Sequence, residues 1–138
     1  MKTLSRDDLL SLAFVFISYL FRETTIHVQR IFLFGSVARG DFDEDSDIDL
    51  FIDTSKTFEQ ETSKKVERAL KRFTLLEQKK WNLKGISNPL NVKVGVLKEW
   101  ELQESVEKEG IVLYSPSVGS NLKKYFLFTL PALTPLKK

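Results

Sequence analysis

The 138-residue chain contains no cysteine. This absence excludes a disulfide framework, a thiolate metal site and a cysteine nucleophile. It also fits a reducing compartment, so a cytoplasmic location is the simplest expectation. Internal repeats and low-complexity tracts are absent as well, and 42% hydrophobic with 29% charged residues is the composition of one globular domain with a real core.

Long hydrophobic runs are also missing. The most apolar segment, residues 9–21, is shorter than the roughly 18 to 20 residues that span a bilayer. Asp7 and Asp8 precede it and no small-residue cleavage site follows, so we expect a buried helix and no membrane partner. Ser5 and Asp8 have the spacing of a capping box, which predicts a helix from Ser5 to about Phe21. Its apolar residues on all sides indicate either thorough burial or a subunit contact.

A strong excess of one charge is lacking too. The net charge of +2 and the isoelectric point near 8.8 are too mild to indicate nucleic acid as a partner, because such binding needs several clustered phosphate contacts. One helical segment nevertheless carries a basic face, which is either a solvated surface or a surface that steers an acidic partner or RNA. Its residues are Lys64, Lys65, Arg68, Lys71, Arg72, Lys79 and Lys80.

The hydrophobic periodicity predicts the order of the elements. Strands are expected at 27–34, 46–53 and 90–97, helices at 57–81 and 99–109, and a short strand or packed edge at 111–114. The stripe of the 57–81 helix contains Val66, Ala69, Leu70, Phe73 and Leu76. This order predicts an α+β domain over residues 1–115, with a small mixed sheet and helices packed on one face. Residues 116–138 are expected to be a tail or the start of a further element.

Residues 33–53, LFGSVARGDFDEDSDIDLFID, crowd many acids into a short stretch. Either this is a solvated acidic turn, or it holds a cation. In the second half of this stretch, the aliphatic residues Ile48, Leu50 and Ile52 occupy every second position. The positions between and beside them hold three acids and one aromatic residue: Asp47, Asp49, Phe51 and Asp53. A strand with this period buries one face and presents carboxylates on the other. A merely solvated turn does not explain that alternation, or the glycine and serine that come before it.

Asp47 and Asp49 share a strand face with their Cα atoms about 6.5 to 7 Å apart, so both can reach one cation or two neighbouring ones. Oxygen ligands of this kind suit Mg²⁺ or Mn²⁺, which complete their coordination with water and substrate phosphates. Gly35 and Ser36 directly follow a buried strand, where backbone N–H groups and a hydroxyl can receive a phosphate. Arg39 is a further candidate for phosphate, although pairing with a neighbouring aspartate explains it equally well.

The stretch GSVARGDFDEDSDIDLFID resembles the signature of the polymerase-beta-like nucleotidyltransferase superfamily, in particular its minimal nucleotidyltransferases, with G-S, ten residues and D-x-D. A segment similar to the closing helix and strand of that family follows at 105–114. The resemblance implies that Gly35 and Ser36 grip the triphosphate of ATP or another nucleoside triphosphate, and that Asp47 and Asp49 are metal ligands. It implies transfer of a nucleoside monophosphate to a hydroxyl. Members of the minimal group often act as antitoxins toward a helical toxin ribonuclease.

One departure from the family pattern concerns its third carboxylate. The strand expected to supply it offers Asn91, Lys93 and Gly95 on one face and valines on the other. Asp53 lies about 13 Å along its strand from Asp49, too far to substitute without a bulge, and Glu99 or Glu101 is a candidate to swing in from beyond the strand. Loss of this ligand should weaken mainly the ion that activates the acceptor. Three readings follow: a Mg²⁺-dependent transferase, a weakened nucleotide-binding module that acts through a protein partner, or the front domain of a longer enzyme.

Overall fold

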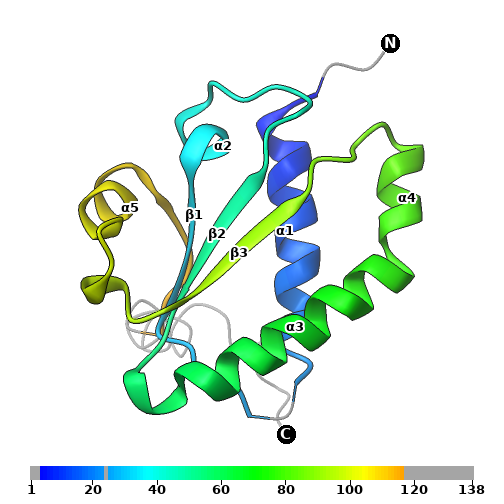
Figure 1. The fold of residues 1–138 in the computed structure, drawn as a ribbon. Coiled ribbons are helices and arrows are strands. Elements are labelled where there is room, and N and C mark those ends of the chain that lie inside the picture. Colours follow the sequence, from blue (N-terminus) through cyan, green and yellow to red (C-terminus); the bar gives the residue numbers. More distant parts are fainter. Residues whose placement is uncertain (1–3, 24, 117–138) are drawn as a thin grey trace, which may run out of the picture.

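The computed structural model describes residues 4–23 and 25–116, and the predicted tail therefore lies almost entirely outside the described residues. Figure 1 shows the elements of this part of the chain. The helices are α1 (Arg6–Leu20), α2 (Gly35–Arg39), α3 (Glu59–Leu76), α4 (Gln78–Leu83) and α5 (Gln103–Glu109), and the strands are β1 (Arg30–Phe34), β2 (Ile48–Asp53), β3 (Leu90–Gly95) and β4 (Ile111–Tyr114). Two short 3₁₀ turns, η1 (Lys56–Phe58) and η2 (Leu97–Glu99), connect them.

The strands form one mixed sheet in the order β3-β2-β1-β4. Strand β1 runs antiparallel to both β2 and β4, whereas β2 and β3 are parallel. The parallel pair requires a crossover, and α3 with α4 supplies it. The predicted α+β class with a mixed sheet is confirmed. Of the two options for residues 111–114, the structure has an edge strand.

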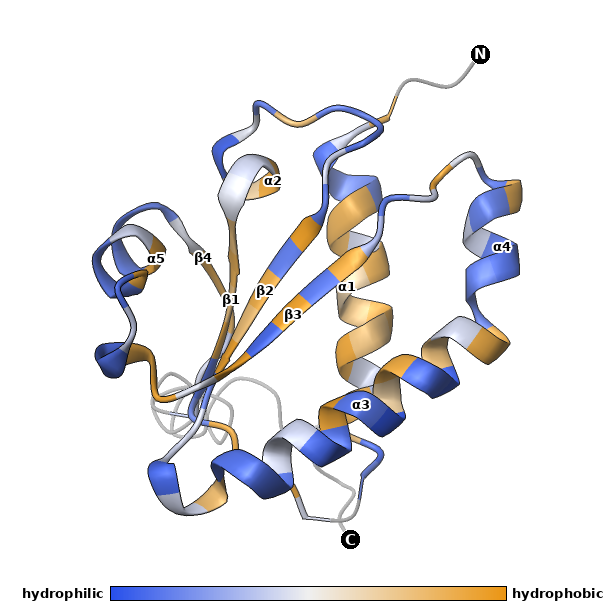
Figure 2. Ribbon diagram, in the orientation of Figure 1, coloured by the Kyte–Doolittle hydropathy of each residue, from blue (hydrophilic) through white to orange (hydrophobic). Residues whose placement is uncertain are grey.

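Helix α1 begins where its sequence predicts. The Ser5 side chain accepts the backbone N–H of Asp8, and the Asp8 carboxylate accepts the backbone N–H of Ser5, so the capping box is complete. Seven of its residues are buried, while Phe14 stays 46% exposed. Figure 2 shows the helix as predominantly hydrophobic. No helix in the described residues is long and apolar enough to cross a membrane.

The main hydrophobic core lies between α1, α3 and one face of the sheet. The predicted alternation of β2 is confirmed, because Ile48, Leu50 and Ile52 are all completely buried in this core. From β1, Ile31 and Leu33 point the same way. Because this face packs against two helices, it determines which residues of each strand point into the core. The residues between them, on β1, β2 and β3, therefore point to the opposite face of the sheet.

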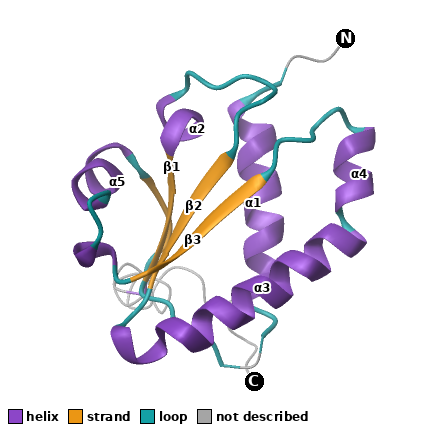
Figure 3. Cartoon of the chain, viewed as in Figure 1, coloured by secondary structure: helices purple, strands orange, loops and turns teal. Residues whose placement is uncertain are grey.

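The predicted helix over 57–81 is interrupted. The chain forms η1 and then α3, and it changes direction at Glu77 before α4, as Figure 3 shows. The Glu77 carboxylate accepts a 2.8 Å hydrogen bond from the Tyr19 hydroxyl of α1, which ties the junction to the core. The prediction that Leu76 belongs to the buried stripe is wrong, because this side chain comes just before the change in direction and is 53% exposed.

A smaller hydrophobic cluster covers one end of the opposite sheet face. Its buried members are Phe32, Phe51, Leu97 and Val106, so η2 and α5 pack on this face. Trp100 meets the Phe51 ring edge-on at 5.1 Å between centroids. The helix predicted from Glu99 begins later, at Gln103, because residues 97–99 form η2 first. This cluster leaves the other end of the face to the polar side chains described next.

Candidate functional site

Three rows of side chains cross the sheet on the face that carries η2 and α5. Residues paired in register on neighbouring strands point to the same face, so the rows follow from the pairing of β1, β2 and β3. The first row is Phe34, Asp49 and Asn91; the second is Phe32, Phe51 and Lys93; the third is Arg30, Asp53 and Gly95. The first row adjoins Asp47 and the start of α2, and is therefore the location of the candidate site.

Gly35 begins α2 and lies directly against the first row. Its φ angle is +77°, a left-handed value that favours glycine. A Cβ atom at this position would collide with the Asp49 carboxylate. The sequence predicted separate roles for Gly35 and Asp49, and the structure brings the two residues into contact.

Helix α2 returns the chain toward β2. The Ser36 carbonyl accepts the N–H groups of Gly40 and Asp41 at 2.8 and 3.1 Å, which ends the helix one turn after Ser36. Arg6 of α1 donates to the carbonyls of Val37 and Ala38 at 3.2 and 2.8 Å. The segment that carries Ser36 is thus fixed to α1, a role for Arg6 that the sequence did not indicate because the contact joins residues 31 and 32 positions apart.

The acidic loop, residues 40–47, is held by hydrogen bonds within the loop and by the segment before β3. The Asp43 carboxylate accepts the N–H of Asp45 and the hydroxyl of Ser46, so Asp43 serves as a turn residue. Asn88, only 3% exposed, donates to the carbonyls of Asp43 and Ser46 at 3.1 and 2.8 Å. This buried amide connects the loop to the segment before β3, and it places the exposed Asp47 at the entry to β2.

Asp49 is the half-buried acid of the site. Burial raises the pKa of its carboxyl above the ordinary value, and repulsion from Asp47 acts in the same direction. A 2.8 Å hydrogen bond from the Asn91 amide opposes this rise in the pKa. The positive charges of Lys93 and Arg39 also lower it. A carboxylate whose charged form is disfavoured by its surroundings gains most from a bound cation.

Arg39 lies at the end of α2 and its side chain is 46% exposed. It pairs with Asp41 at 3.4 Å and with Glu109 of α5 at 3.9 Å. The pairing with a neighbouring aspartate, one of the two readings of its sequence context, is therefore present. Exposed pairs at these distances are weak, so the guanidinium is available to an anion.

Asp53 has a structural role in the third row. It is 4% exposed and accepts two hydrogen bonds from Arg30, at 3.0 and 3.2 Å, and one from the N–H of Leu97 at 2.9 Å. These bonds hold the turn after β3 beside β2. The Asp53 carboxylate is therefore occupied with structural hydrogen bonds at the end of the sheet away from Asp49.

Glu99 is one of the two acids expected to be able to reach the site from beyond β3. It lies on η2, and its carboxylate pairs with the ammonium of Lys56 on η1 at 3.2 Å. Among the residues that the structure describes, no group of three acidic or histidine side chains could hold a metal ion. Asn91 occupies the position directly across from Asp49. The strand position closest to Asp49 thus carries a neutral amide and no third acid.

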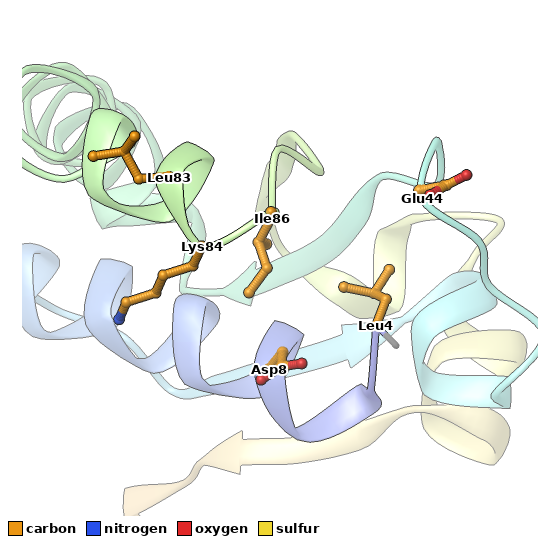
Figure 4. A pocket seen from close by; sticks show the side chains of 7 residues that line it. Leu4, Asp8, Glu44, Leu83, Lys84 and Ile86 are labelled. Atoms are coloured by element: carbon orange, nitrogen blue, oxygen red, sulfur yellow. The ribbon is translucent and has the colours of Figure 1, made fainter. Parts of the chain in front are cut away.

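The cavities of the described region include one of about 360 Å³ beside the acidic loop. Figure 4 shows its lining side chains, which come from the N-terminal segment, from Glu44 and from the end of α4. None of the predicted site residues lines it. The candidate site is instead at the first row, whose Phe34, Asp49 and Asn91 are partly exposed.

A family model described as a nucleotidyltransferase domain matches residues 18–113 of the 138. No curated protein sequence matches the chain. One similar solved structure is described as the crystal structure of a toxin-antitoxin with AMP-PNP; it has 18% sequence identity and a TM-score of 0.43, and the match covers 87% of this chain and 97% of that one. At this degree of similarity it carries no information on function.

Proposed function

Because the chain belongs to the nucleotidyltransferase domain family, we propose that it transfers a nucleoside monophosphate from ATP or another nucleoside triphosphate to a hydroxyl group. The observation that carries the proposal is the first row, where Gly35 abuts Asp49 and Asp47 stands at the entry to β2. The acceptor oxygen forms a bond to the α-phosphorus while the bond to pyrophosphate breaks, and the hydroxyl proton passes to water.

The donor set fits one divalent cation. Asp47 and Asp49 offer carboxylate oxygens on one face, and a rotation of the Asn91 amide would present its carbonyl oxygen in place of its NH₂ group. Oxygen ligands of this number suit Mg²⁺ or Mn²⁺ that also binds water and phosphate. Such an ion would neutralise charge on the triphosphate. On β3, the residue directly across from Asp49 is Asn91, so no acid stands there to help hold a second ion.

The other residues of the site have roles in binding and orientation. Gly35 allows the chain to approach the first row closely, and Ser36 supplies a hydroxyl at the start of α2. Arg39 contributes a positive charge on the same side. These roles are the ones that the sequence resemblance implies, and nucleotide titrations of the corresponding variants test them.

A second function is a nucleotide-binding module that acts through a protein partner, as an antitoxin does toward its toxin. Two observations favour it: the missing third carboxylate, and exposed leucines on α3 and α4. Leu75 and Leu76 are consecutive and are 83% and 53% exposed, and Leu83 is 82% exposed, among lysines and arginines of the predicted basic face. Where large apolar side chains are exposed next to one another, they mark a candidate surface for a protein partner.

The test is calorimetric titration with each of the four nucleoside triphosphates, with and without Mg²⁺. We expect Mg²⁺-dependent binding that Asp47→Ala and Asp49→Ala abolish. Asp45→Asn is the matched control, because it removes one negative charge from the acidic loop without touching the first row. Label transfer from α-labelled nucleotide to a hydroxyl acceptor then separates the transferase from the binding module. Absence of binding by the wild type under all conditions would reject both.

A further inference from the structure

Lys93 lies beside the candidate site on the same face of the sheet. Lys93 follows Asn91 by two positions in β3, so its side chain emerges in the second row. The Cα atoms of Asn91 and Lys93 are about 6.5 to 7 Å apart along the strand. Its partner in register on β2 is Phe51, which is completely buried. A lysine therefore adjoins the place where the family supplies a third acid.

Aromatic rings lie on the side of Lys93 that faces the third row, away from the first row. Trp100 packs edge-on against Phe51 and also covers Gly95 so tightly that a Cβ atom there would collide with the indole. Trp100 thereby covers the Gly95 end of the third row, while Phe34, Asp49 and Asn91 of the first row stay partly exposed. Lys93 itself is only half-buried, and its ammonium is close enough to Asp49 to lower the pKa of that carboxyl.

The charge of the site calls for such a group. A nucleoside triphosphate carries several negative charges, and the acidic loop and the two aspartates repel it. Nucleotidyl transfer is catalysed largely by positive charge around the phosphates. Because Asn91 and not an acid stands across from Asp49, the site is short of a ligand for a second ion, and we expect part of that positive charge to come from the protein.

We propose that Lys93 binds the phosphates of the nucleotide, and that its ammonium supplies the positive charge that a second metal ion supplies where three acids are present. The inference rests on the proposed function, since it needs a nucleotide on the first row. A lysine is a common phosphate ligand because it acts as a compact point charge. Lys93 is then part of the binding machinery as well as a neighbour of Asp49.

The experiment is calorimetric titration with an ATP analogue whose α,β-bridging oxygen is replaced by methylene, so that transfer cannot occur. It is run in EDTA and again across a series of Mg²⁺ concentrations. We expect the wild type to bind measurably in EDTA, and Lys93→Ala to weaken this binding about 10-fold or more, the size of a charged hydrogen bond. Lys93→Arg should retain most of it. With Mg²⁺, the data should require one ion per nucleotide.

Lys98→Ala is the matched control, because it removes the same charge from the exposed turn η2 after β3, and it should change the affinity less than about 2-fold. Thermal unfolding of each variant verifies that it is folded. Equal affinities of wild type and Lys93→Ala in EDTA, or no binding in EDTA with aspartate-dependent binding in Mg²⁺, would overturn this inference and leave the proposed function standing. No binding under either condition would reject both.

Discussion

At the scale of single residues, the site relies on a glycine in two separate ways. Gly35 adopts a positive φ angle, and its missing side chain leaves room for the Asp49 carboxylate. The first requirement concerns backbone strain alone, whereas the second concerns the geometry of the site. The two can be separated because Gly85 has a similar φ of +86° but no atom near the position of its Cβ.

We therefore expect Gly35→Ala to lower the free energy of unfolding by more than about 1 kcal/mol and also to abolish nucleotide binding, since the methyl group displaces Asp49. Gly85→Ala should show the stability loss without the loss of binding. Urea unfolding and calorimetric titration of both variants measure the two effects. Unchanged affinity in Gly35→Ala would show that the contact with Asp49 is unimportant for the nucleotide.

Asn91→Asp tests the missing third acid directly. The new carboxylate would face Asp49 across the strands, and burial already raises the pKa of Asp49. Without metal, the repulsion should lower the melting temperature at pH 7, and the loss should disappear below the ordinary aspartate pKa of about 3.9, where the neutral forms predominate. Mg²⁺ should have the opposite effect on the melting temperature of this variant, because the added carboxylate is a further ligand. The ion should therefore raise the melting temperature more in Asn91→Asp than in the wild type.

The control for that variant is Asn82→Asp on α4, which adds the same charge away from the site and should leave the effect of Mg²⁺ unchanged. If Asn91→Asp gained no additional stabilisation from Mg²⁺ or Mn²⁺, the position across from Asp49 would not be a ligand position. Label transfer by the same variant shows whether the added acid also raises the rate.

At the scale of elements, local patterns predicted more than long-range pairings. The capping box fixed the start of α1, and the period of two separated the core face of β2 from its polar face. The register of β3 against β2 depends instead on a parallel crossover, so no local pattern could show that Asn91 faces Asp49. The same holds for the Asn88 contact with the acidic loop and for the Arg30 partner of Asp53, which join distant segments.

The junction of α3 and α4 shows a similar limit. The helical pattern over 57–81 has no glycine or proline, and the change of direction at Glu77 coincides with a tertiary contact, the hydrogen bond from Tyr19. This bond holds the pKa of the Glu77 carboxyl below its ordinary value and raises the pKa of the Tyr19 hydroxyl. The contact therefore makes the stability of the junction depend on pH.

We expect Tyr19→Phe to be less stable than the wild type between about pH 5 and pH 10. The depressed pKa of Glu77 means that the contribution is complete above the ordinary glutamate value and is lost as the pH falls through the folded one. The raised pKa of Tyr19 means that it is lost again as the pH rises through the folded tyrosine value. Urea unfolding at acidic, neutral and alkaline pH checks this. Tyr114→Phe, whose ring packs on Phe21, should show no such profile.

At the scale of the whole molecule, the sheet separates stability from chemistry. One face packs against α1 and α3 and contains the main core, whereas the other carries the first row and only a small aromatic cluster. A charged, partly buried site is destabilising on its own, and the large core on the opposite face offsets it. Mutations on the two faces should consequently have different effects.

Phe73→Ala on α3 should lower the free energy of unfolding by about 3 to 5 kcal/mol, because Phe73 is 2% exposed and meets the rings of Phe16 and Tyr19 edge-on at 6.5 and 6.3 Å. Leu75→Ala on the same helix, at a side chain 83% exposed, should cost less than about 0.5 kcal/mol. Measured at a temperature where each variant is folded, nucleotide affinity should match the wild type in both. A several-fold loss of nucleotide affinity in folded Phe73→Ala would mean that packing on the core face also controls the position of Asp49. The link would be β2, because its residues Ile48 and Leu50 belong to the same core as Phe73, whereas Asp49 lies on its other face.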